Sequence, residues 1–103
     1  MRREGNRLRR ERRDGPEFRE FLAGVGRRIC FLRERAGLTQ MEAAQAAGMD
    51  ARLWQRLEAG DANSTILVFH DVARALDVEL SSVMRPKARR NENPRRPGRP
   101  PRR

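Results

Sequence analysis

The chain has 103 residues, the length of one ordinary domain, and its 24 Lys and Arg exceed its 14 Asp and Glu to give a net charge of +10. This basic surplus suits a polyanionic partner such as nucleic acid, or an anionic membrane surface. The single cysteine excludes an intramolecular disulfide, and no apolar run approaches the roughly 20 residues of a membrane span. The charged start of the chain lacks the apolar stretch of a signal peptide, so we expect a cytoplasmic protein.

Composition divides the chain into three parts. Residues 1–15 are rich in Arg and Glu with little to bury, so we expect a flexible basic arm. Residues 85–103 hold five of the six prolines and nine basic residues against a single acid, which predicts a disordered Arg/Pro-rich tail. The nearly neutral residues 16–84 carry regular apolar spacing and form the predicted all-α domain.

The first predicted helix of this domain spans about residues 17–36. Pro16 suits the first helical position, and Gly37 marks the end. Apolar residues recur at steps of three and four and define an inner face: Phe18, Leu22, Val25, Ile29, Leu32 and Ala36. Gly24 and Gly26 each weaken a helix by up to ~1 kcal/mol relative to Ala, so the helix could break or begin late there.

Two short helices follow, over about residues 40–47 and 51–59. Thr39 is the expected N-cap of the first, where Glu42 can complete a capping box, and Asp50 is the expected N-cap of the second. The turn between them is about three residues long and contains a glycine. Two helices with this connection fit a helix-turn-helix. At 100° per residue, one side of the second helix is expected to pack on the core and the opposite side to face solvent. The inner side holds Leu53, Trp54 and Leu57, and the outer side holds Ala51, Arg52, Gln55, Arg56 and Ala59.

Two more helices are predicted, over about residues 65–76 and 80–84. Ser64 or Thr65 caps the first of them. Its predicted inner face consists of Ile66, Phe69, Ala73 and Leu76. No strand pattern competes, so the predicted fold is a five-helix all-α domain flanked by disordered basic arms.

Short motifs run through residues 25–84 without a gap. The most specific are Gly37-Leu38-Thr39-Gln40 and Leu57-Glu58-x-Gly60. The others are Gly26-Arg27-Arg28-Ile29, Leu32-Arg33-Glu34-Arg35, Ala44, Gly48, Asn63, Ala73-Arg74-Ala75-Leu76, Val78 and Leu80. Together they resemble the lambda-repressor/Cro-like family, also called the xenobiotic response element family. The resemblance implies five helices and a homodimer on two half-sites of double-stranded DNA. We expect the dimer surface on the last helix and the end of the helix before it, including Val83 and Met84.

The resemblance also implies which side chains contact DNA. Arg52 and Arg56 match base-contacting positions, and Arg can donate two parallel hydrogen bonds to guanine. Gln40 matches a position that typically clamps a phosphate. The full implied set is Thr39, Gln40, Ala51, Arg52, Leu53, Gln55, Arg56 and Asn63. Arg33 and Glu58 match positions that pair as a buried or half-buried structural ion pair.

Two departures from the family's pattern, at Ala43 and Phe31, bear on packing. Ala43 stands where the family usually has Leu, and the large Trp54, expected in the core, can fill the missing volume. Phe31 falls at a commonly polar position, where it covers the N-terminal arm, forms a partner surface, or is simply a partly covered apolar residue.

The tail sequence RRPGRPPRR resembles the AT-hook, a motif of the minor groove, but Pro97 precedes Gly98 where that motif has Arg. The alternatives are that the tail binds phosphates without sequence preference, or that it is solvated and has no role.

The sequence does not favour an enzyme. His70 is the only histidine, and no triad spacing, metal-ligand cluster or Gly-rich phosphate loop accompanies it, so we expect no cofactor and no metal. The favoured function is sequence-specific DNA binding by a nucleoid-associated transcriptional regulator, in particular a repressor. A restriction–modification controller, an antitoxin with a toxin or other protein partner, and an interaction module without DNA binding remain alternatives.

Overall fold

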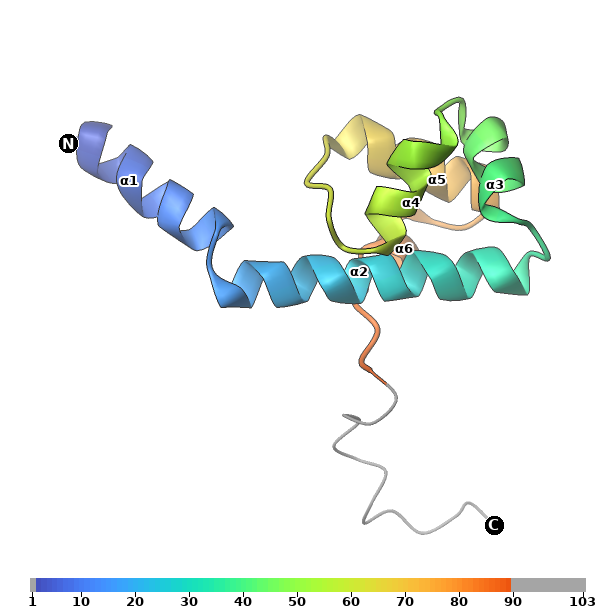
Figure 1. The fold of residues 1–103 in the computed structure, drawn as a ribbon, viewed down its shortest axis with the longest axis horizontal. Helices are drawn as coiled ribbons and strands as arrows, with labels where there is room; N and C mark the ends of the chain where they lie inside the picture. The colour runs from blue at the N-terminus through green and yellow to red at the C-terminus, as the bar shows by residue number, and fades with distance from the viewer. Residues whose placement is uncertain (1, 90–103) are drawn as a thin grey trace, which may run out of the picture.

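The computed structural model describes residues 2–89 and shows no strand in that range (Figure 1). Its helices are α1 (Arg2–Arg13), α2 (Pro16–Arg35), α3 (Gln40–Ala47), α4 (Ala51–Glu58), α5 (Ile66–Leu76) and α6 (Leu80–Val83). The expected all-α fold is therefore confirmed. The five expected helices correspond to α2–α6 with boundaries within one residue, and α1 is an additional helix.

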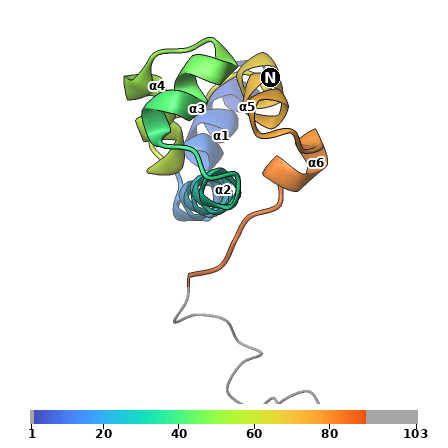
Figure 2. The ribbon, with the colours of Figure 1, turned by 90° about the vertical axis from the view of Figure 1, so that its right-hand side faces the viewer.

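The long helix α2 forms the base of the domain. α3, α4 and α5 lie together on one side of it, and α6 closes the core from the flank (Figures 1 and 2). The core between these helices contains Val25 and Ile29 of α2, the small side chains of α3, and the fully buried Trp54 of α4. The buried face of α2 thus packs against the pair α3–α4 and holds α4 at the surface of the domain.

Local capping fixes the boundaries of α3 and α4. The Thr39 hydroxyl accepts a hydrogen bond from the Glu42 backbone N–H at 3.0 Å, and the Glu42 carboxylate accepts one from the Thr39 N–H at 2.9 Å. The expected capping box is therefore present. Gly48 ends α3 in the left-handed region at φ 76°, which an L side chain rarely adopts, and Asp50 caps α4. These short-range devices set the angle between the two helices.

α2 runs unbroken through Gly24 and Gly26, so the expectation of a break there is wrong. Both glycines are buried because other segments approach the helix closely at these positions. A Cβ on Gly26 would meet the backbone carbonyls of Leu57 and Glu58 at the end of α4. The two glycines lower helix propensity but permit this close packing, and packing determines the outcome.

The expected flexible arm at residues 1–15 is largely helical in the structure. α1 occupies Arg2–Arg13, and Gly15 and Pro16 separate it from α2. Arg and Glu are good helix formers, although a segment with a single apolar residue, Leu8, gives no periodic pattern by which to recognise a helix. α1 projects away from the domain beside the start of α2 (Figure 1).

Three further expectations about buried positions are wrong. Ala36, expected on the inner face of the first helix, follows the last residue of α2 and is exposed. Ile66 is not on the inner face of α5, since it is the first residue of the helix and 65% exposed, and Val72 is buried instead. Val83, which we expected on a dimer surface, is fully buried in the monomer core.

The first residues of the expected tail, 85–89, pack against α2 on the side away from α3–α5 (Figures 1 and 2). The Lys87 N–H donates to the Gly24 carbonyl at 2.9 Å, and Arg27 Nε donates to the Lys87 carbonyl at 2.7 Å. The Lys87 ammonium lies 4.7 Å from the centre of the half-buried Phe31 ring, so the start of the tail covers this residue. The rest of the expected tail lies outside the described residues.

Candidate nucleic-acid interface

α4 presents one polar face to solvent and one apolar face to the core. Trp54 and Leu57 are buried, whereas Arg52, Gln55 and Arg56 are exposed. The expected arrangement of this helix is therefore present for these five residues. Ala51 and Leu53 are half-buried and pack against the core, so Ala51 does not share the fully exposed arc to which we assigned it.

The two arginines of α4 differ in their surroundings. Arg52 lies in the first turn of the helix, and within residues 5–89 its exposed guanidinium has no hydrogen-bond or ion-pair partner. Arg56 lies one turn later, and its Nη2 donates to the Asp61 carbonyl in the α4–α5 loop at 2.7 Å. Arg52 can thus reach a ligand without breaking an existing bond, and Arg56 can do so with its remaining N–H groups.

The two residues at the start of α3 that we expect to contact DNA form hydrogen bonds within the protein. The Thr39 hydroxyl is used by the helix cap, and Gln40 Nε2 donates to Glu58 Oε1 at 2.8 Å. The Gln40 side chain is half-buried by this contact. Its carbonyl oxygen takes no part in the bond, and the hydrogen bond fixes the amide at the edge between α3 and α4.

Glu58 at the end of α4 accepts hydrogen bonds from three side chains. The expected ion pair with Arg33 is present and bidentate, with Nε–Oε2 at 2.5 Å and Nη2–Oε1 at 3.2 Å. Trp54 Nε1 also donates to Oε2, at 2.6 Å, and Gln40 donates to Oε1. Burial by itself would raise the pKa of the Glu58 carboxyl, but these N–H donors outweigh it and hold the pKa below its usual range.

Sequence reasoning identified the Arg33–Glu58 pair but missed the other two donors. Trp54 and Glu58 are four residues apart on one helix, so they share a face. A buried indole N–H also requires an acceptor. The spacing of these two residues was thus the available signal, whereas the Gln40 contact depends on how α3 packs against α4.

Asn63 lies in the loop between α4 and α5, a few residues after the end of α4. It is exposed, and it lines a groove that α1 and the start of α2 also line. The structure thus places one implied DNA-contacting residue next to the additional helix.

Neither a membrane span nor a metal cluster occurs in the described part of the chain. None of the helices between residues 2 and 89 has the length and apolar character to cross a bilayer. No three His, Cys, Asp or Glu side chains in this range lie together as a metal site would require.

The domain formed by α2–α6 is similar to known proteins. The family model described as a helix-turn-helix domain matches residues 25–83. The crystal structure of the restriction-modification controller protein C.AhdI from Aeromonas hydrophila has 31% sequence identity and a TM-score of 0.59, covering 60% of this chain and 90% of that chain. No curated protein matches. The chain therefore belongs to the helix-turn-helix domain family.

Proposed function

We propose that the protein is a sequence-specific double-stranded DNA-binding regulator of transcription that places α4 in the major groove. The observation that carries this proposal is Arg52, which is exposed, has no partner among residues 5–89, and lies in the first turn of the second helix of the helix-turn-helix. Residues near the N-terminal end of such a helix reach base edges, and Arg recognises guanine through two acceptors. Gln55 and Arg56 continue the same exposed face.

Within this function we favour a regulator of the lambda-repressor/Cro-like type. The similarity to C.AhdI, a restriction-modification controller protein, favours a controller over an antitoxin. Thr39, Gln40, Ala51, Leu53 and Asn63 would contact the DNA backbone or bases at the margins of the α4 interface.

We also propose that the protein binds DNA as a homodimer. One domain of this size covers a short site, and two-fold symmetric binding doubles the sequence that is read. Val83 cannot contribute to the interface because it is buried, but the half-buried Met84 after α6 still can. A symmetric footprint with half-sites about 10 bp apart, or a multiple of this spacing, would support the dimer.

Binding-site selection from a random duplex pool with the full chain tests the proposal. We expect enrichment of one sequence with a guanine opposite Arg52. Arg52→Ala should then weaken binding to the selected duplex by about 1–3 kcal/mol and relax the preference at that base pair, with a much smaller effect on random DNA.

Arg74→Ala, which removes the same charge from an exposed position on α5, provides the matched control. Equal losses for the two variants on both duplexes, or the absence of any enriched sequence, would contradict the proposal.

A further inference from the structure

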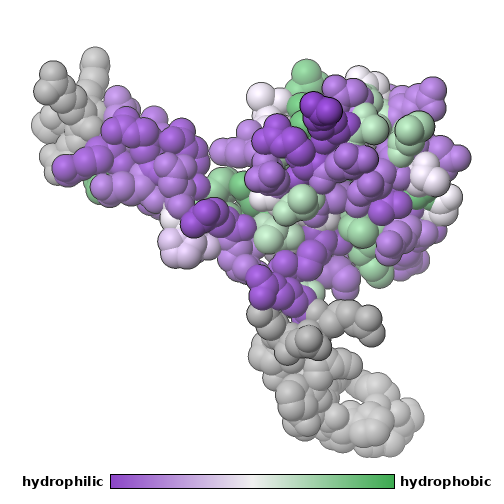
Figure 3. All heavy atoms as spheres, viewed as in Figure 1, coloured by the Kyte–Doolittle hydropathy of each residue, from purple (hydrophilic) through white to green (hydrophobic). Residues whose placement is uncertain are grey.

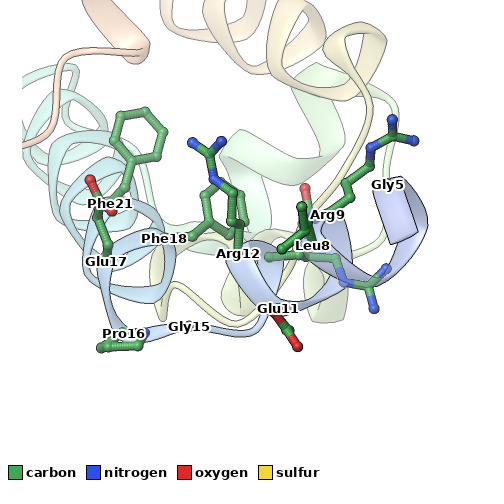
Figure 4. A pocket seen from close by; sticks show the side chains of 12 residues that line it. Gly5, Leu8, Arg9, Glu11, Arg12, Gly15, Pro16, Glu17, Phe18 and Phe21 are labelled. Carbon is green, nitrogen blue, oxygen red and sulfur yellow. The ribbon is translucent and has the colours of Figure 1, made fainter. Parts of the chain in front are cut away.

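The structure adds a basic helix beside the helix-turn-helix. A groove separates α1 from the start of α2, and we call it the α1–α2 groove. Its apolar floor is formed by Leu8, Phe18 and Phe21, and Arg9 and Arg12 lie on its α1 side (Figure 4). In Figure 4 the Arg12 side chain points from α1 into the groove.

The protein neutralises only part of the charge of α1. Residues 5–13 contain five arginines and one glutamate. Three of these arginines, Arg9, Arg10 and Arg12, are exposed and have no hydrogen-bond or ion-pair partner within residues 5–89. Figure 3 shows the described part of α1 as an almost continuous hydrophilic surface. An array of fixed positive charges without internal partners fits a polyanion.

The same charges make α1 a helix of low intrinsic stability. A 12-residue helix is marginal in water, and like charges three and four residues apart repel each other. The one apolar side chain among residues 5–13, Leu8, remains 51% exposed, so packing adds little. A bound polyanion would remove the repulsion and stabilise the helix.

The arginines of α1 occupy two different sides of the helix. At 100° per residue, Arg12 lies next to Leu8 on the groove side and Arg9 lies beyond it on the same side, whereas Arg7 and Arg10 point away from the groove. Asn63 of the α4–α5 loop lines the same groove. The loop is tied to the exposed face of α4, because Arg56 donates to the Asp61 carbonyl. The groove side of α1 thus shares its lining with the loop that directly follows α4.

We propose that α1 is a second DNA-binding element, in which Arg9 and Arg12 contact backbone phosphates that flank the sequence read by α4. This inference rests on the proposed function of α4. Glu11 and Glu17 also line the groove and limit its charge; the arginines that line it are Arg9, Arg12 and Arg13, of which Arg13 pairs with Asp14. Phosphate contacts of this kind add affinity without sequence preference and lengthen the protected site.

Two double variants of the full chain test this assignment. R9Q/R12Q removes two charges from the groove side, and R7Q/R10Q removes two from the opposite side of the same helix. DNA affinity is measured over a range of salt concentrations on two duplexes. One is the selected duplex with flanking DNA, and the other is the same duplex trimmed to the footprint of the R9Q/R12Q variant. Hydrogen exchange of the α1 amides is measured on the wild type with and without DNA.

We expect R9Q/R12Q to reduce the slope of log affinity against log salt by about 1.8 on the flanked duplex, with little change on the trimmed one. R7Q/R10Q should stay close to the wild type, and DNA should slow exchange in α1. Equal losses in both variants, no loss in either, or unchanged exchange would overturn the role of α1 while leaving DNA binding by α4 intact. A wild type that selects no duplex would instead overturn the proposed function itself.

Discussion

Glu58 joins three helices of the domain through a single carboxylate. It receives N–H groups from Arg33 of α2, Gln40 of α3 and Trp54 of its own helix, and the Arg33 and Glu58 side chains are only 13% and 6% exposed. A charged group with so little solvent contact depends on its partners. Because α4 carries the proposed base-reading arginine, this carboxylate also fixes the position of the proposed DNA-binding surface.

We expect Glu58→Gln to lower the free energy of unfolding by about 3–5 kcal/mol at neutral pH, since it leaves the Arg33 guanidinium without its counter-charge. Denaturant unfolding measures this change. Glu34→Gln removes a carboxylate from an exposed position on α2. It is the control and should have little effect. A loss below about 1 kcal/mol for Glu58→Gln would mean that solvent already screens the pair.

The pH dependence of the same variant follows from the lowered pKa of Glu58. A depressed carboxyl pKa stabilises the folded protein above the unfolded value of about 4.3, and this contribution is lost as the pH falls through the folded value. The difference in stability between the wild type and Glu58→Gln should therefore be constant near neutral pH and shrink below about pH 4.3. A difference that stays constant through the acid range would contradict this account.

Gly26 provides a test of packing against helix propensity. Gly26→Ala should raise propensity by about 1 kcal/mol, but its Cβ would collide with the backbone carbonyls of Leu57 and Glu58. We expect a net destabilisation of about 1–3 kcal/mol in thermal unfolding. Gly5→Ala in α1, where no atom lies within 4 Å of the added Cβ, should show no loss. A stabilised Gly26→Ala would show that α2 and α4 can separate at no cost.

At the scale of a single element, α3 illustrates how the chain fixes a short helix. Its eight residues are too few for independent stability, so its capping box and its contacts with α4 must hold it. Thr39→Ala should cost about 1 kcal/mol because it removes the hydroxyl that accepts the Glu42 N–H. Thr39→Ser retains the hydroxyl and should stay near the wild type; equal losses for both variants would implicate the Thr methyl group instead.

The elements α2–α6 were predictable because adjacent residues specify their ends. Thr39, Gly48 and Asp50 act on backbone groups within three residues of themselves, so their effect is readable in sequence. α1 was not predictable, because its single apolar residue, Leu8, cannot form a periodic apolar pattern. The packing of residues 85–89 on α2 was equally hidden, since it depends on Gly24 leaving room for the chain.

The candidate site divides in the same way. Arg52 and the Arg33–Glu58 pair followed from helical spacing and from the resemblance, respectively. The contact of Arg56 with the Asp61 carbonyl and that of Gln40 with Glu58 depend on tertiary packing and had no signal in sequence. DNA contact by any of these residues stays a prediction.

At the scale of the whole molecule, the two basic extensions leave the domain from different places. α1 precedes α2 and shares the α1–α2 groove with Asn63 of the α4–α5 loop, whereas residues 85–89 run along the side of α2 away from α3–α5 (Figures 1 and 2). The two extensions can therefore contribute to DNA binding in different ways. In the proposed complex α1 would lie against DNA that flanks the α4 site, whereas the chain leaves Arg89 on the side of α2 away from α3–α5.

Truncation at two points separates the roles of the tail. Removing residues 90–103 takes away six arginines and one glutamate, and this length can span about 46–50 Å when extended at roughly 3.3–3.6 Å per residue, enough to reach around the domain. We expect this truncation to weaken binding to every duplex alike and to reduce the salt slope by at most about 5, with an unchanged Tm. Removing residues 85–103 should in addition lower the Tm by about 4–8 °C if the lost contacts of Lys87 with Gly24 and Phe31 amount to about 1 kcal/mol. An unchanged salt slope after the shorter truncation would show that residues 90–103 do not contact DNA, and an equal Tm for both truncations would show that residues 85–89 add nothing to the fold.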